Sequence, residues 1–458
     1  MVPLWSLAVH AGSLAALAAD PFSLPATVVT LDNGLTVLLL EDHRTDTVAL
    51  HISYGVGSRD EGPAEAGCAH LFEHLMFEGS RGVPGDKFDT WLTAAGGDNN
   101  AWTSEDETAY HMTFPSGALD LALFLESDRL GFLDAGLVPE NLANQQHVVL
   151  QERAEGYAEP NGRDQDSLSR ILWPEGHPYH RPVIGTVADI EGFSLDATRS
   201  FWESHYRTRN AVLALVGNFD TATATERVKH WFSDVPDRGP ALDRQPAPVA
   251  GGGTGKVAGV VEDDVEERTV YLAWETVDER HADAPALDVL GAVLSNGQGT
   301  RLDDAVYYGS QLASSVGAYA YAEDVAGQFV VYASSPDTPL PKLVGKLNKQ
   351  LDKIAAAPPT ADELARAKRA LRAYLLDGIE RPADKASQLA TCWRWTGAAD
   401  CLAAEWARYD AVTAADVTRV AAKYLSGPPT TLSNVPRGDA ASAVPGADGS
   451  PAVAVELP

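Results

Sequence analysis

The feature that most constrains this sequence is a short apolar stretch that carries two histidines and a glutamate. His70, Glu73 and His74 stand at positions i, i+3 and i+4, so a helix would project all three side chains from one side. Apolar residues fill most other positions of the stretch, which predicts a helix buried on most of its circumference. Two neutral imidazoles one turn apart can bind zinc, and the glutamate between them is placed to act on water at the metal.

The residues around this motif decide how it is interpreted. Two core histidines bonded to backbone carbonyls would leave the same pattern, and the motif also arises by chance. A second helix is predicted from Pro139 to a stop at Pro160, and it carries Glu152 and Glu155 on adjacent turns. A third, acidic metal ligand is therefore available on another helix.

With this spacing, H-x-x-E-H is the inverted zincin motif. The chain resembles the pitrilysin/insulinase-type zinc metallopeptidases, and in length it is closest to their bacterial branch that is similar to the mitochondrial processing peptidase. In that family a glutamate about this far beyond the second histidine completes the metal site, and Glu152 matches it. The resemblance implies one Zn²⁺ per chain, bound by His70, His74 and Glu152. It also implies that Glu73 is the catalytic residue of a zinc-dependent endopeptidase, which hydrolyses peptides or unfolded polypeptide segments through zinc-activated water.

A predicted strand after the metal helix is the expected place for the substrate. Asn100-Ala101-Trp102-Thr103, followed by Tyr110, resembles the edge strand that lies beside the metal in this family. An edge strand has free N–H and C=O groups, so an extended peptide can add to it as a further strand. We therefore expect Asn100 and Ala101 to bind substrate, although an ordinary sheet strand would show the same sequence.

Two further residues of the second helix are expected to support the metal ligands through hydrogen bonds. Gln145 lies two turns before Glu152, where many relatives have a second acidic residue, and its amide can still hydrogen-bond a ligand. Glu155 follows Glu152 by one turn.

Length and composition predict two domains. A chain of 458 residues is too long for one ordinary domain, and 45% hydrophobic with 22% charged residues is a globular composition. We expect an N-terminal zinc-binding domain at 24–235, a linker at 236–255 that is repeatedly broken by Pro and Gly, and a C-terminal domain at 256–436. The tail at 437–458, rich in Ala, Gly, Pro and Ser, is expected to be disordered.

The two predicted domains show similar patterns. A strand ending at Tyr54 precedes the metal helix, and a strand at 268–275 precedes a helical run at 286–296 that has no matching His or Glu pair. Together with the resemblance, this predicts an α+β fold of two homologous α/β-sandwich domains, each with an antiparallel-rich sheet and helices on one side. This is the duplicated pitrilysin-like fold, and its second half would bind no metal.

The resemblance also predicts a partner. In relatives that work alone or as homodimers, the second half supplies an Arg and, seven residues later, a Tyr to the active site. Here Tyr307 and Ser314 fall at those positions. We therefore expect a heterodimer with a related subunit that lacks the zinc motif, while a homodimer or a self-sufficient enzyme are the alternatives. A rival function is a zinc-bearing, non-catalytic assembly or processing-scaffold subunit.

The chain is strongly acidic, with a formal net charge of −29 and a pI near 4.7. This charge argues against nucleic acid as a partner and favours cationic ligands such as basic peptides. A solvated acidic surface without selectivity would give the same balance.

The first 19 residues form a largely apolar run that ends in Ala16-Leu17-Ala18-Ala19. This run resembles the apolar core and cleavage site of a signal peptide, although no Lys or Arg precedes Arg44. We expect a periplasmic or secreted protein, with a cytoplasmic one as the alternative. No apolar run is long enough for a stable membrane span.

Three cysteines allow one disulfide. Cys392 and Cys401 could pair in an oxidising compartment, whereas Cys68 is expected to be a small buried residue of the metal helix. Cys68 lies off the metal-facing side of that helix, so we do not expect it to be a ligand.

Overall fold

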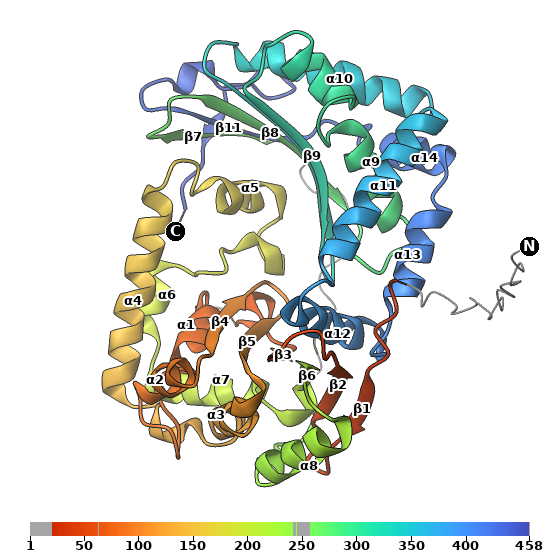
Figure 1. Cartoon of the computed structure of the whole chain (residues 1–458). Coiled ribbons are helices and arrows are strands. Elements are labelled where there is room, and N and C mark those ends of the chain that lie inside the picture. Colours follow the sequence, from red (N-terminus) through yellow and green to blue (C-terminus); the bar gives the residue numbers. More distant parts are fainter. Residues whose placement is uncertain (1–20, 63, 241–243, 245–256, 458) are drawn as a thin grey trace, which may run out of the picture.

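The structure is a computed structural model that describes residues 21–62, 64–240, 244 and 257–457 (Figure 1). The expected signal peptide at 1–19 lies outside these residues, as does most of the expected linker at 236–255. In the part of the chain described, no helix is long and apolar enough to cross a membrane.

Among the described residues, the N-terminal half contains a six-stranded sheet in the order β1-β2-β6-β3-β5-β4. All neighbouring strands are antiparallel except β2 and β6. A hairpin around Asn33-Gly34 pairs β1 with β2. The strands are β1 (Thr27–Thr30), β2 (Thr36–Glu41), β3 (Thr47–Tyr54), β4 (Asp98–Thr103), β5 (Thr108–Pro115) and β6 (Ala211–Gly217).

Apart from α5, the helices of this half lie on one side of the sheet, where alternate residues of each strand point into a shared core. Val48, Leu50, Ile52 and Tyr54 of β3 all lie in this core with less than 1% exposure. The helices are α1 (Cys68–Leu75), α2 (Lys87–Ala94), α3 (Leu119–Gly131), α4 (Pro139–Ala158), α5 (Asp164–Leu172), α6 (Val187–Gly192), α7 (Leu195–His205) and α8 (Thr221–Phe232).

The C-terminal half repeats this topology, with a sheet in the order β12-β7-β11-β8-β10-β9 among the described residues. Four of its five pairings have the same directions as those of the first sheet, including the parallel pair β7–β11. The pairing at the β12 edge differs, because β12 is parallel to β7 whereas β1 is antiparallel to β2. The duplicated α+β fold predicted from the sequence is therefore confirmed. The strands are β7 (Ala258–Asp263), β8 (Arg268–Thr276), β9 (Ser315–Ala322), β10 (Gly327–Ser335), β11 (Thr430–Pro436) and β12 (Val453–Ala454).

The helices of the second half follow in the corresponding order. They are α9 (Ala284–Leu294), a π-helical turn η6 (Asp303–Tyr308), α10 (Leu340–Ala356), α11 (Ala361–Asp377), α12 (Pro382–Thr396), α13 (Leu402–Ala411) and α14 (Ala414–Tyr424). By position in the chain, α9 corresponds to α1, α11 to α4 and α12 to α5.

The prediction of a disordered tail at 437–458 is wrong for the residues that the structure describes. A short turn η7 (Ala440–Ser442) follows β11, and β12 then pairs in parallel with β7 at the sheet edge. Val444 is buried in the core of the C-terminal half. The small, turn-forming residues suggested disorder. The tail is ordered because β12 pairs with the edge strand β7 and because Val444 packs into the core.

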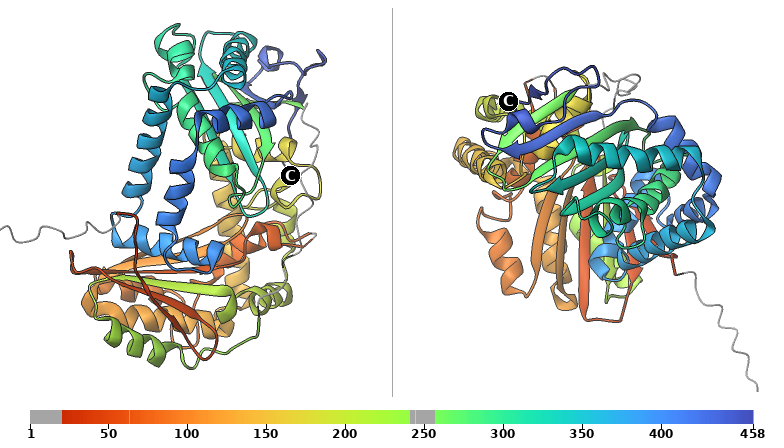
Figure 2. Two further views of the ribbon diagram at one scale, coloured as in Figure 1. Left: turned by 90° about the vertical axis from the view of Figure 1, so that its right-hand side faces the viewer. Right: turned by 90° about the horizontal axis from the view of Figure 1, so that it is seen from above.

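Each sheet has its second face covered by a helix from the other half (Figure 1). Helix α12 packs on the N-terminal sheet, where Leu389 and Ala390 contact a cluster that includes Leu38 and Val212. Helix α5 packs on the C-terminal sheet in a cluster that includes Leu168. The two sheets lie one above the other, with these helices between them (Figure 2).

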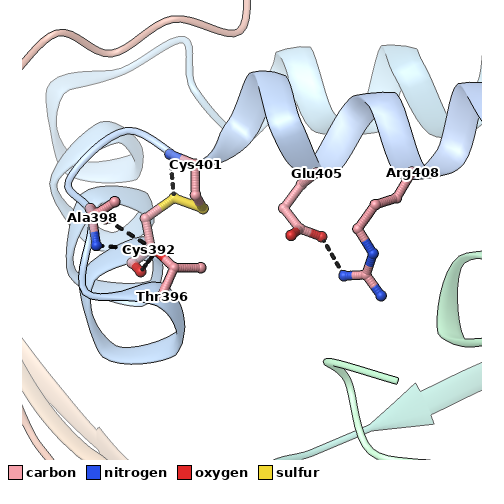
Figure 3. The surroundings of a disulfide bond; sticks show 6 residues. All are labelled: Cys392, Thr396, Ala398, Cys401, Glu405 and Arg408. Carbon is pink, nitrogen blue, oxygen red and sulfur yellow. Dashed lines mark hydrogen bonds and ion pairs between the residues drawn. A yellow bond between two sulfur atoms is a disulfide. The ribbon is translucent and has the colours of Figure 1, made fainter. Parts of the chain in front are cut away.

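A disulfide joins Cys392 near the end of α12 to Cys401 at the start of α13, as the sequence allowed (Figure 3). The backbone N–H of Cys401 also donates to Cys392 Sγ. Thr396, between the two cysteines, donates from Oγ1 to the carbonyl of Cys392. The free cysteine, Cys68, is buried on α1.

Candidate metal centre

The start of α1 is fixed by a close backbone approach and by a buried carboxylate. Gly67 precedes the helix with φ 95°, and a Cβ there would lie 2.8 Å from backbone atoms of Ile184 and Gly185, so only glycine fits. The carboxylate of Glu61 accepts the N–H groups of Gly67 and Ala69. Burial raises the pKa of Glu61 to about 8, although these N–H groups act in the opposite direction.

His70, His74 and Glu152 come together at the contact between α1 and α4. Their nearest ligand atoms lie within 4.8 Å of one another, and the described residues contain no second group of this kind. Glu152 Oε2 lies 3.4 Å from His70 Nε2 and 3.3 Å from His74 Nε2. The structure therefore brings the three predicted ligands together from two helices that are far apart in sequence.

This cluster has the chemistry of a divalent-cation site. Hydrogen bonds from His70 and His74 hold the pKa of Glu152 well below its usual range. Burial lowers the pKa of His70, but the carboxylates of Glu152 and Glu73 outweigh it and raise that pKa to about 9. Two imidazoles and one carboxylate leave a fourth tetrahedral position open, which is the donor set of catalytic zinc sites.

Gln145 orients one of the two histidines. Its Oε1 lies 3.2 Å from His74 Nδ1, so a proton on Nδ1 leaves Nε2 free to face Glu152. Its amide nitrogen donates to the carboxylate of Glu78. Because an amide both accepts and donates, glutamine can bridge an imidazole N–H and a carboxylate. A second glutamate at this position would instead place two carboxylates side by side.

Glu73 lies next to the cluster but is not one of its three converging ligands. It is 8% exposed, and its Oε2 lies 3.4 Å from His70 Nδ1. Thr103 Oγ1 donates to the same oxygen at 2.6 Å. This role of Thr103 was not predicted, and the only signal in the sequence was its position at the end of the expected edge strand.

Strand β4 is the edge of its sheet among the described residues, as predicted. Asn100 and Ala101 line a cavity of about 490 Å³ together with Glu73 and His74. We call this space the β4 cavity. The predicted substrate-binding residues and the predicted catalytic residue therefore border one space.

The expectation that Glu155 supports the metal ligands is wrong. Its side chain is exposed and accepts a hydrogen bond from Gln151 Nε2 at 2.8 Å. The carboxylate of Glu152, one turn earlier, is the one that faces His70 and His74.

The positions expected to lack an Arg and a Tyr lie in the C-terminal half. Tyr307 is on η6 and is 41% exposed, while Ser314 precedes β9 and donates to the carboxylate of Glu267. Neither lines the β4 cavity.

Comparison with protein families gives two adjacent matches. The family described as "Insulinase (Peptidase family M16)" matches residues 36–187, which include Glu73 and all three residues of the cluster. The description "Peptidase M16 inactive domain" matches residues 192–371, which include β7 to β10 and most of α11.

Curated relatives are described as zinc proteases. An "Uncharacterized zinc protease" of Rickettsia bellii is 26% identical over 363 residues, which cover 79% of this chain and 86% of the relative. "Zinc protease PqqE" of Helicobacter pylori is 26% identical over 376 residues, which cover 79% of this chain and 82% of the relative.

Solved structures share the fold. The crystal structure of a protease from Helicobacter pylori superposes with a TM-score of 0.80 at 25% identity and covers 91% of this chain and 100% of that one. A peptidase M16 inactive domain from Pseudomonas fluorescens has a TM-score of 0.78 at 21% identity, covering 90% and 98%. Given the matched sequence segments and the duplicated fold, this chain belongs to the insulinase family of peptidases, family M16.

Proposed function

We propose that this chain is a zinc-dependent endopeptidase that hydrolyses peptides or unfolded polypeptide segments. The observation that carries the proposal is the position of Glu73 beside, but outside, the three converging ligands. A purely structural zinc site would more often be closed by a fourth protein ligand. The printed names of the relatives, zinc proteases, agree with this function.

The residues of the site have separate roles in the proposed reaction. His70, His74 and Glu152 would hold the zinc ion, and Gln145 would keep His74 in the correct tautomer. When bound in such a site, zinc polarises a carbonyl and makes water a nucleophile near neutral pH.

Glu73 is the proton carrier of the proposed reaction. Its Oε2 is held by Thr103, so Oε1 remains to accept a proton from the attacking water and to pass it to the leaving amine. Strand β4 would hold the substrate main chain in extended form along the cavity.

We further propose that the active enzyme is a heterodimer with a related subunit that lacks the zinc motif. The proposal rests on Tyr307 and Ser314, which stand where related enzymes would have an Arg and a Tyr. We also propose export to the periplasm or beyond the cell. The disulfide between Cys392 and Cys401 supports an oxidising compartment.

The test is hydrolysis of an unstructured peptide library by the zinc-loaded chain and by its Glu73→Gln variant. Glu73→Gln is expected to keep its zinc and to lose turnover by roughly 10²- to 10⁴-fold, because the proton carrier is gone. Glu155→Gln is a matched control, since it removes an exposed carboxylate one turn beyond Glu152 and should leave turnover unchanged.

Equal turnover in wild type and Glu73→Gln would refute the catalytic role. Cleavage by the chain alone that depends on Glu73 would support the peptidase and contradict the need for a partner. Zinc binding without any cleavage, even after the companion subunit is added, would favour the scaffold function.

A further inference from the structure

The β4 cavity extends from the candidate metal centre along the first turn of α2, and its far wall is acidic. Besides Glu73, the carboxylates of Glu78, Asp86 and Asp89 line it. Apart from His74, the described residues that line the cavity include no basic side chain.

The hydrogen bonds of these carboxylates leave their charge largely uncompensated. Asp89 Oδ1 accepts from the neutral amide of Asn99 at 2.8 Å, and Glu78 accepts from the neutral amide of Gln145. Asp86 pairs with Lys87 at 2.7 Å, but both side chains of that pair are exposed. Exposed pairs of this kind compensate charge only weakly.

An aromatic ring provides an apolar wall in the same cavity. Phe77 is half-buried and packs edge-on against Phe88, with ring centroids 5.5 Å apart. A long side chain with an apolar stem and a charged end fits such a space, because the stem can lie against the ring while the end reaches a carboxylate.

We propose that the β4 cavity selects substrates with an arginine or lysine beside the scissile bond, through Asp89 with Glu78 and Asp86. This inference rests on the proposed peptidase function. Glu73 and His74 border the same cavity as Asp89, so a side chain that occupies it belongs to a residue close to the reacting amide. An acidic side chain at that position would be repelled by the same carboxylates.

The test uses three peptides that are identical except at one residue next to the cleaved bond, which carries arginine, norleucine or glutamate. For the zinc-loaded wild-type enzyme, with its companion subunit where turnover requires it, kcat/KM should follow that order. The arginine peptide should exceed the norleucine peptide by roughly tenfold, because the charge pairs form in a partly enclosed space.

Two substitutions at one residue separate charge from shape. Asp89→Asn keeps the acceptor for Asn99 and should reduce the preference for arginine over norleucine by about threefold. Asp89→Lys should reverse the order of the arginine and glutamate peptides. Glu226→Lys, on α8 and outside the cavity, changes the net charge equally and should leave all ratios as in wild type.

Binding of the same labelled peptides to zinc-loaded Glu73→Gln, measured by fluorescence anisotropy, separates this inference from the proposed function. If Glu73→Gln binds the arginine peptide most tightly and Glu73→Gln/Asp89→Lys does not, the proposed selectivity of the cavity is supported, even if the wild type shows no hydrolysis. Glu73-dependent hydrolysis with equal kcat/KM for the three peptides would overturn this inference, but it would still support the proposed peptidase function. A preference that persists in Asp89→Lys would also overturn it.

Discussion

The two halves of the molecule contain the same groove with different chemistry. In the first half, α1 packs against α4 and the edge strand β4, and in the second half α9 packs against α11 and the edge strand β9. The second groove encloses a cavity of about 310 Å³. At the spacing of His70, Glu73 and His74, α9 has Asp288, Gly291 and Ala292, which line that cavity.

Helices α1 and α9 have buried apolar residues at the same relative positions, whereas the residues on their other sides differ. Leu71, Phe72 and Leu75 of α1 are fully buried, as are the residues of α9 at the same spacing, Val289, Leu290 and Val293. The buried side of the helix therefore builds the fold, and the residues on its other side, together with Glu152 of α4, decide whether the groove can bind a metal. This is a clear case of a function located in a site rather than in a fold.

The largest expected effect comes from exchanging one residue between the grooves. His74→Ala removes one of only three protein ligands and should reduce zinc from one ion per chain to none, with loss of turnover. Ala292→His places a histidine at the matching position of α9 and should still give one zinc per chain, because Gly291 and Asp288 do not complete a site. Zinc per chain is measured by elemental analysis after dialysis, and full zinc in His74→Ala would exclude that ligand.

A smaller effect is expected from the residue that orients His74. Gln145→Leu removes the acceptor for His74 Nδ1 and the donor to Glu78, so zinc affinity should fall by roughly 10- to 100-fold.

Gln146→Leu is the matched control on the same helix. Gln146 donates to the carbonyls of Ile190 and Phe193, so its loss should lower the melting temperature and leave zinc affinity unchanged. Competition with a zinc chelator measures both variants. Equal affinities of Gln145→Leu and wild type would show that His74 needs no support from Gln145.

The smallest effects are expected from replacing the carboxylates at the starts of α9 and α1, Asp283 and Glu61. The contributions of these two groups to stability should depend on pH in opposite directions. At the start of α9, Asp283 binds Arg419, Lys423 and Tyr424. Burial raises the pKa of Asp283, but these three partners outweigh it and hold the pKa well below its usual value. Such a group stabilises the native state above about pH 4 and loses this contribution as the pH falls.

Asp283→Asn should therefore lower the free energy of unfolding by about 1–2 kcal/mol at pH 7, with a shrinking difference from wild type below about pH 4. Denaturant titrations over a range of pH measure it. A difference that does not change between pH 7 and pH 3 would mean that the charge of Asp283 is not involved.

Glu61, at the start of α1, should behave in the opposite way. Its raised pKa means that its contribution to stability is complete below about pH 4.5 and is lost as the pH rises through about 8. Glu61→Gln cannot lose this proton, so its stability relative to wild type should increase from pH 5 to pH 8. A relative stability that falls over this range would contradict a raised pKa.

Local sequence patterns were sufficient to predict the metal helix and indicated the duplication, whereas the edge strand was identified through the resemblance. The spacing of His70, Glu73 and His74 fixes a helical face, and the strand patterns repeat in the second half, so neither prediction depended on distant contacts. Glu152 was found through the resemblance, since nothing in its own surroundings distinguishes it from Glu155. The structure separates the two, because Glu152 faces His70 and His74 whereas Glu155 is bonded to Gln151.

Features set by contacts between distant segments could not be predicted. The hydrogen bond of Thr103 to Glu73 depends on how β4 lies beside α1, and the pairing of β12 depends on an edge left free by β7. The amphipathic patterns of α5 and α12 predict helices but do not specify which sheet each one covers.

That exchange of α5 and α12 has a consequence for the origin of the chain and for its dissection. The two helices occupy equivalent positions in the two repeats, so the molecule is organised as a domain-swapped dimer whose two copies have become one polypeptide. A gene fragment that ends after α8 would leave Leu38, Ala49 and Val212 without their cover from α12. We therefore expect neither repeat to fold on its own, and the half that holds the candidate metal centre to depend for its stability on the half without one.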